Sequence, residues 1–200
     1  MRPVGRRAAQ LLPAATLSPG PARAQDAAAG LEALMRAMAA VRQREDRFAE
    51  DKVIPELDLP LPSTGVLRWQ APDRLEKHTT SPIEERLRVQ GGRMLYERPD
   101  RGIAREFGLD EQPELRALVE SVRATLAGDL VALRRHYDAA FDGSPEGAWR
   151  LVLTPLSARV RAAVQRIGVA GRGPQLVSVE TEGGGGVTRM RITPGPPRGG

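Results

Sequence analysis

Residues 63–100 constrain the fold more than any other part of the chain, because they read as four short strands joined by tight turns. Apolar and polar residues alternate in each strand, which places the apolar side chains on one face of a sheet. Pro72-Asp73 and Ser81-Pro82 break the pattern, and Gly91-Gly92 supplies the positive φ that a two-residue hairpin loop requires. The stretch therefore predicts an antiparallel meander with one apolar face. That face carries Leu67, Trp69, Ala71, Leu75, Leu87, Val89, Met94 and Tyr96.

Two amphipathic helices are predicted, one on each side of the meander. Apolar residues recur three and four positions apart within residues 31–41 and again within 115–126, which is the spacing of one helical face. Proline is tolerated in a first turn, so Gln112-Pro113 is expected to begin the second helix, and Gly128-Asp129 is expected to interrupt it. The two stripes are Leu31, Leu34, Met35, Met38 and Val41, and Leu115, Leu118, Val119, Val122 and Leu126.

Further strands are predicted on both sides of the second helix. Residues 48–54 are expected to begin the sheet, and the prolines of the connection that follows should keep it out of any central ladder. Residues 130–141 fit both a helical stripe and a strand, and we favour a short helical turn followed by a strand. A helical turn is also expected within 157–165. The other strands are marked by Trp149, Leu151 and Leu153, by Ile167 and Val169, by Val177 and Val179, and by Met190 and Ile192.

Strands, a helix and more strands, with local connections throughout, predict an α+β protein with one large curved antiparallel sheet. The ends of the chain differ from this middle part. Residues 1–24 combine early arginines, an apolar run and the A-x-A cleavage signal at 22–24, so they predict a secretory signal peptide; a disordered Ala/Pro tail is the alternative. Residues 25–193 are expected to form the mature domain, and residues 194–200 a disordered tail.

The charge of the chain depends on whether its first segment is removed. The whole chain has 30 basic and 25 acidic residues, a formal charge of +5 that would suit a nucleic-acid-binding protein. Four arginines precede residue 25, so the remainder has 26 basic and 25 acidic residues and a charge of +1. No basic stripe with interleaved aromatic residues remains, and we expect no nucleic-acid partner. All basic residues except Lys52 and Lys77 are arginines, which indicates a compositional bias rather than a binding patch.

No catalytic constellation is visible in the sequence. The absence of cysteine excludes disulfides, thiolate metal sites, cysteine catalysis and lipidation of the protein itself on a cysteine. His78 and His136 lie on the polar sides of predicted strands without metal-ligand spacing, and no serine lies in a G-x-S-x-G elbow. The glycine run 183–186 lies between two strands without a nearby lysine, so it predicts a hairpin loop rather than a phosphate loop. We therefore expect no enzyme, no metal site and no cofactor.

Trp69 and Trp149 are expected to point to the same side of the sheet. Either residue could simply belong to the core, or both could line an apolar cavity between the sheet and the helices. Both interpretations need the same inward-facing apolar side chains, so the pattern leaves them open.

Several motifs follow one another in a recognisable order. They are an export signal and a helix, S-x-G-x-L-x-W-x-x-P-D-R-L at 63–75, R-L-R-V-Q-G-G-R-M-L-Y at 86–96, a mid-chain helix, and W-R-L-V-L-T-P at 149–155 ahead of I-x-V-x-G at 167–171. In this order the chain resembles the periplasmic outer-membrane lipoprotein carrier family, LolA. The similarity spans most of residues 30–192 and is closer to divergent LolA-related proteins than to the principal carrier.

The resemblance implies an incomplete antiparallel β-barrel whose apolar cavity is covered by a helical lid. It also implies a monomeric carrier in the periplasm of a Gram-negative bacterium. Such a carrier takes the acyl chains of a lipoprotein from an inner-membrane transporter and passes them to an outer-membrane receptor; a glycolipid cargo is equally compatible. On this basis we expect the cavity to be lined by Leu67, Trp69, Leu87, Val89, Met94, Tyr96, Trp149, Leu151 and Leu153. The lid is expected to contribute Leu115, Leu118, Val119 and Val122.

One departure from the family pattern concerns the lid. The principal carrier has an arginine just before the proline that corresponds to Pro72, and that arginine helps to latch the lid. Here the position is Ala71, and Arg68 or Arg74 is the candidate substitute. The alternative function, a LolA-like sensor or scaffold that binds a protein partner, keeps the same fold but does not need a deep cavity.

Overall fold

The computed structural model describes residues 21–195. The predicted signal peptide lies outside these residues except for its last four positions, which begin the first helix. The predicted tail lies outside them from residue 196 onward. Of its first two residues, Gly195 is held to the sheet because its backbone N–H donates a hydrogen bond to Asp46 Oδ1 at 3.0 Å.

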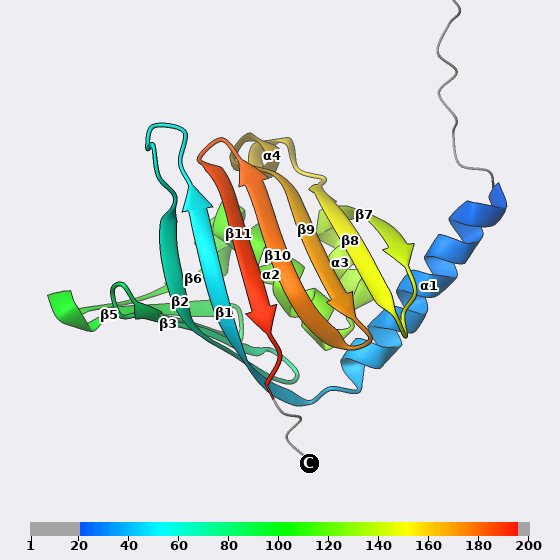
Figure 1. Ribbon diagram of the computed structural model, residues 1–200, viewed down its shortest axis with the longest axis horizontal. Helices are drawn as coiled ribbons and strands as arrows, with labels where there is room; N and C mark the ends of the chain where they lie inside the picture. The colour runs from blue at the N-terminus through cyan, green and yellow to red at the C-terminus, as the bar shows by residue number, and fades with distance from the viewer. Residues whose placement is uncertain (1–20, 196–200) are drawn as a thin grey trace, which may run out of the picture.

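The described residues form one curved sheet of eleven antiparallel strands in the order β6-β5-β4-β3-β2-β1-β11-β10-β9-β8-β7 (Figure 1). Strands β6 and β7 are its free edges, so the sheet is an incomplete barrel, as predicted. The strands are β1 (Gln43–Val53), β2 (Leu61–Gln70), β3 (Arg74–Ser81), β4 (Glu85–Gln90), β5 (Arg93–Arg98), β6 (Ile103–Gly108), β7 (Tyr137–Gly143), β8 (Ala148–Pro155), β9 (Val164–Arg172), β10 (Gln175–Gly183) and β11 (Gly186–Thr193).

Four α-helices accompany the sheet: α1 (Pro21–Ala39), α2 (Pro113–Ala127), α3 (Leu130–His136) and α4 (Ala158–Ala163). Two short 3₁₀ turns, Pro99–Arg101 and Leu109–Glu111, flank β6. Helices α2 and α3 lie behind the sheet in Figure 1, and α1 runs along the side that carries β7. None of the described helices is both long and apolar enough to cross a membrane.

The predicted meander is confirmed as strands β2 to β5. Its cross-strand register places Trp69 opposite Leu75, Leu75 opposite Val89, and Val89 opposite Met94, so one apolar row runs across all four strands. Gly91 and Gly92 have φ values of 58° and 73°, the positive values that the two-residue loop requires. The fold thus places a mainly apolar surface, with Lys77 as a charged member, on the face of the meander that α2 covers.

Several element boundaries differ from the sequence prediction. Helix α1 ends at Ala39, before Val41, and β1 begins at Gln43 rather than at Phe48. Pro62 does enter a ladder, opposite Asp51 of β1, but it precedes Thr64, the first residue of β2 that pairs with β3, so its missing N–H interrupts no bond between β2 and β3. Strand β6 was not predicted, because its only apolar residues are separated by the charged pair Arg105 and Glu106.

The core lies between the sheet and the helices. The predicted stripe on α1 is buried through Leu31, Leu34, Met35 and Met38. Gly128 ends α2 with φ 66° and a Cβ there would come within 2.1 Å of the Met35 carbonyl oxygen. Only glycine satisfies both conditions, so this position lets α2 end directly against α1.

Candidate functional site

A cavity of about 500 Å³ lies between the concave face of the sheet and α2. Its walls come from three parts of the chain: the meander, the paired strands β1, β11 and β10, and one face of α2. The apolar lining consists of Leu67, Trp69, Leu75, Leu87, Val89, Met94, Leu115, Leu118, Val119, Val122, Leu126, Leu176, Val179, Met190 and Ile192.

The meander supplies the first wall. Five of the residues predicted for the cavity line it: Leu67, Trp69, Leu87, Val89 and Met94. Trp69 is 2% exposed, and its indole N–H donates to the carbonyl oxygen of Val41 at 3.3 Å, which fixes the ring against the connection between α1 and β1. The indole is therefore a wall of the cavity with its polar edge already satisfied.

Helix α2 covers the opening above the meander. Leu115, Leu118, Val119 and Val122, the residues predicted for the lid, all line the cavity, together with Leu126. Their spacing of three and four positions puts them on one side of the helix. The stripe read from the sequence is thus the face that the helix turns toward the cavity.

The remaining residues predicted for the cavity lie elsewhere. Trp149, Leu151 and Leu153 of β8 are at most 3% exposed, but they belong to the packed core and are not part of the lining. Tyr96 shares a face with Met94, yet its hydroxyl donates to Glu85 Oε1 at 3.1 Å outside the lining. Strand β8 lies too far along the sheet toward its β7 edge, where α1 and α3 fill the concave side.

The second wall was not predicted as part of the site. Leu176 and Val179 of β10 and Met190 and Ile192 of β11 line the cavity, because β11 pairs with β1 and brings the end of the chain beside the meander. Val179 lies opposite Met190, and Met190 lies opposite Glu50. Val179, Met190 and Ile192 belong to the predicted strands, but Leu176 is not among the predicted residues. Val177, which with Val179 marks that strand in the sequence, is 39% exposed, because a register shift between Leu176 and Ser178 interrupts the alternation. No local signal shows which strand β11 joins.

The cavity also has polar lining residues. Glu50 of β1 accepts hydrogen bonds through both carboxylate oxygens from Lys77 Nζ of β3, at 2.7 and 2.8 Å. The same ammonium lies 5.0 Å from the centroid of the Phe48 ring, within the range of a cation–π contact. The Glu50–Lys77 pair spans β2 at Gly65, where a Cβ would meet the Phe48 ring at 2.8 Å.

Neither arginine predicted as a substitute for the missing latch contacts α2. Arg68 is a lining residue of the cavity, but it bonds Glu45 and Glu76 of the neighbouring strands, at 2.9 and 2.6 Å. Arg74 is exposed at the β2–β3 turn. Arg44, which is not among the predicted substitutes, lines the cavity and donates to the Pro174 carbonyl oxygen at 2.5 Å. Burial lowers the pKa of Arg44, and the nearby Asp46 carboxylate opposes that shift.

Two contacts from the other side fasten α2. The buried Tyr137 hydroxyl, at the start of β7, donates to the Ala117 carbonyl oxygen in the middle of the helix. Near its beginning, Arg159 of α4 donates to Glu114 Oε1 at 3.0 Å. A backbone hydrogen bond and then this guanidinium lower the pKa of Glu114. These contacts hold the helix over the cavity without an arginine at position 71.

The histidines lie outside the cavity. His78 is half-buried on the opposite face of β3, with Nε2 3.1 Å from Glu84 Oε1. His136 was expected on a strand, but it is the last residue of α3, and the strand begins at Tyr137. Burial lowers the pKa of His136. Among residues 21–195 no group of three metal-binding side chains comes together.

Comparison with known structures finds similar chains at low sequence identity. A LolA superfamily protein from Nitrosomonas europaea is 11% identical, with 84% of this chain and 91% of that chain covered and a TM-score of 0.46. MucB of Pseudomonas aeruginosa, solved with MucA, is 14% identical over 87% of this chain and 59% of that chain, with a TM-score of 0.44. The Mycobacterium tuberculosis lipoprotein LppX is 12% identical over 82% and 93%, with a TM-score of 0.41.

A search of curated proteins finds no match to this chain. A sequence model of the family described as outer membrane lipoprotein carrier protein LolA-like matches residues 19–195. That match covers the whole sheet, all four helices and every residue of the cavity lining. The chain therefore belongs to the LolA-like family of outer membrane lipoprotein carrier proteins.

Proposed function

We propose that this protein is a carrier that binds the acyl chains of a lipoprotein or a related envelope lipid in the cavity beneath α2. The observation that carries the proposal is the continuity of the apolar lining, which runs from Trp69 and Met94 on the sheet to Leu118 and Val122 on the helix. A cavity of this size lies within the range of small-molecule sites in proteins, about 300–1,000 Å³.

The physical driving force for such binding is ample. Burial of an acyl chain contributes about 0.8 kcal/mol for each CH₂ group, so ten buried groups contribute about 8 kcal/mol before the cost of association. No covalent chemistry is needed, because removal of the chain from water is itself the source of affinity. Release then requires only that α2 move away from the sheet.

The wider setting belongs to the same proposal. We place the protein in the periplasm after removal of the segment that ends near residue 24. The expected partners are an inner-membrane transporter that loads the cargo and an outer-membrane receptor that accepts it. Membership in a family of carriers supports this setting, and a protein partner alone, as in a sensor or scaffold, is the alternative.

Titration of the purified protein with a long-chain fatty-acyl probe tests the proposal, with tryptophan fluorescence as the readout, since Trp69 of the two tryptophans lines the cavity. Val122→Asp puts a carboxylate in the cavity lining and should abolish binding, because an unpaired charge is costly to bury beside an acyl chain. Val131→Asp is the matched control, since Val131 is 71% exposed on α3 and should tolerate the same change. Wild-type protein that is purified without lipid and binds no acyl probe would refute the carrier and favour the partner-binding alternative.

A further inference from the structure

The two lysines of the chain both line the cavity. The sequence contains 28 arginines and two lysines, and the lysines lie far apart at Lys52 and Lys77. The fold brings both to the concave face, on β1 and β3. The only two side-chain ammonium groups of the chain therefore lie at one site.

Lys52 is the one cation of the lining that has no ionic or hydrogen-bonding partner in the described part of the chain. Lys77 is held by both oxygens of Glu50, and Arg44 and Arg68 are bonded as described above. The Lys52 ammonium is exposed to solvent at the rim and free to bind an anion.

Two hydroxyl groups lie beside this ammonium. Lys52 lies directly opposite Thr188 of β11, and Thr188 lies directly opposite Thr181 of β10. Opposite residues in an antiparallel pair have Cβ atoms about 5 Å apart, so the three side chains form one polar row across three strands. All three line the cavity, and within residues 21–195 neither threonine hydroxyl has a hydrogen-bond partner. The row therefore offers donors that the protein itself leaves unused.

The charge around the row favours an anion. The nearest acidic group on the same face is Glu50, and its pairing with Lys77 neutralises it. Glu180 and Glu182 of β10 point to the other face, where they pair with Arg189 and Arg166. Among the lining residues near the row, Lys52 is therefore the one positive charge that no carboxylate pairs with, and Glu56 and Asp58 of the β1–β2 loop are not part of the lining.

The row lies at the hairpin end of the sheet. The β1–β2 loop begins directly after Val53, and the β10–β11 turn precedes Gly186, whose added Cβ would meet the Val53 carbonyl oxygen at 2.0 Å. Figure 1 shows these two hairpins side by side at the top of the sheet. The apolar lining lies farther from the hairpins, where Met190 follows Thr188 on the same face. A molecule bound along the cavity would have its chain on the apolar lining and its head at the row.

We infer that the row formed by Lys52, Thr181 and Thr188 binds the phosphate head group of an acyl lipid whose chain occupies the cavity. A phosphate suits the row, because an ammonium and two hydroxyls can all donate to its several oxygens. This inference rests on the proposed function, since it identifies the class of cargo that the cavity takes. A phosphate that belongs to an acyl lipid is favoured over the phosphate of a small free ester, because the row and the apolar lining are parts of one cavity.

The test compares two ligands that differ only in the phosphate: 1-myristoyl lysophosphatidic acid and 1-myristoylglycerol, both titrated below their aggregation limits. Wild-type protein should bind the phosphate lipid about tenfold more tightly, the difference that one charge-assisted hydrogen bond supplies. Lys52→Gln should remove this preference and leave the affinity for 1-myristoylglycerol unchanged. Arg47→Gln, a basic residue on the opposite face of the same strand, should keep the preference.

The possible failures separate the two proposals. Equal affinity of the wild-type protein for both lipids, or a preference that survives Lys52→Gln, would overturn the head-group site and leave the carrier intact. Binding of neither lipid would overturn the carrier itself. Glycerol 3-phosphate and inorganic phosphate are titrated as separate ligands. Either of them binding as tightly as the phosphate lipid would overturn the lipid as the source of the phosphate.

Discussion

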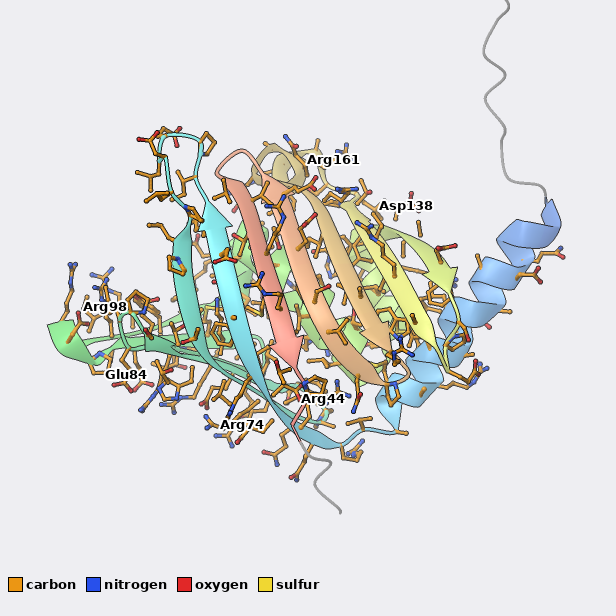
Figure 2. All side chains as sticks on the ribbon, in the orientation of Figure 1. Arg44, Arg74, Glu84, Arg98, Asp138 and Arg161 are labelled. Carbon is orange, nitrogen blue, oxygen red and sulfur yellow. The ribbon has the colours of Figure 1, made fainter. Side chains whose placement is uncertain are left out.

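The Tyr137 hydroxyl donates a hydrogen bond to the Ala117 carbonyl oxygen and so joins the edge strand β7 to the middle of α2. Both residues are buried, and burial raises the pKa of Tyr137 above the ordinary tyrosine value. The contact ties the helix that covers the cavity to the part of the sheet that carries no cavity lining. It gives the helix a fixed point outside the binding site. Figure 2 labels Asp138, which follows Tyr137 on β7, and Arg161 of α4, and both side chains are exposed.

Replacement of this hydroxyl should loosen the helix without emptying the core. Tyr137→Phe removes one buried hydrogen bond and should reduce the free energy of unfolding by about 1 kcal/mol. It should also increase the rates of acyl-probe entry and exit, measured by stopped-flow fluorescence. An unchanged exit rate would show that the helix is held by other contacts.

The same residue should make the protein sensitive to alkaline pH. Folded Tyr137 keeps its proton above pH of about 10, where an unfolded tyrosine loses it, so the folded state binds more protons. The contribution of Tyr137 to the free energy of unfolding is therefore fully present below pH of about 10. It falls as pH rises toward the raised pKa of the folded state, by up to about 1.4 kcal/mol per pH unit. Urea unfolding at pH 9 to 11 measures this slope. The free energy of unfolding of the Tyr137→Phe variant should fall less steeply with pH than that of the wild-type protein. Parallel slopes for the two proteins would contradict the assignment.

Core and cavity should respond differently to the same truncation. Leu151→Ala removes a side chain with no exposure from the packed part of the sheet and should cost about 2–5 kcal/mol of stability. Leu118→Ala removes a half-buried lining side chain and should cost less stability but weaken acyl binding. Denaturant unfolding and probe titration of both variants distinguish the roles. The reverse result would put β8, rather than α2, against the ligand.

The Glu50–Lys77 ion pair should matter to stability chiefly because each charge neutralises the other, so that the loss of one partner is costlier than the loss of both. Lys77→Met leaves the Glu50 carboxylate, whose side chain is 15% exposed, without its cation. This should reduce the free energy of unfolding by about 1–3 kcal/mol, the cost of a partly buried group that loses its partner. The double variant Lys77→Met with Glu50→Leu should recover most of the loss, because two apolar side chains leave no charge to desolvate. A double variant as unstable as the single one would assign the loss to packing around Phe48.

Two glycines with similar backbone angles should tolerate alanine very differently. Gly128 has φ 66° and its added Cβ would lie 2.1 Å from the Met35 carbonyl oxygen, whereas Gly91 has φ 58° and open space around it. Gly91→Ala should therefore cost about 1 kcal/mol through its backbone angle alone. Gly128→Ala should cost several times more in thermal unfolding, because α1 and α2 must also separate. Equal losses would mean that the helix crossing adapts to the methyl group.

The meander could be predicted in detail because its information is local. Alternation, two proline breaks and a glycine pair set both the turns and the inward face, and six of its inward residues line the cavity. The stripe on α2 was equally readable, since helical spacing alone defines it. Charge-rich β6 carried no such alternation, so its pairing with β5 depends on the edge that the meander presents.

Long-range pairing is what the sequence could not show. Trp149, Leu151 and Leu153 alternate as clearly as the meander residues, yet strand order places them beyond the cavity. Lys52 and Lys77 lie 25 positions apart in the sequence. They line the same cavity only because β2 pairs with both β1 and β3. The hydrogen bond from Tyr137 to Ala117 joins β7 to α2, and no local sequence pattern predicts it.

The pairing of β1 with β11 has a consequence for the order in which the protein is built. Phe48 lies opposite Ile192, so a wall of the cavity is completed by almost the last residues of the described chain. A chain that emerges N-terminus first presents the meander and α2 well before Met190 and Ile192 arrive. Until they do, the edge of β1 is unpaired and the pocket is open on that side. Strand β11 is the last of the described strands to be synthesised, so the wall of the cavity is completed only near the end of the translation of residues 21–195.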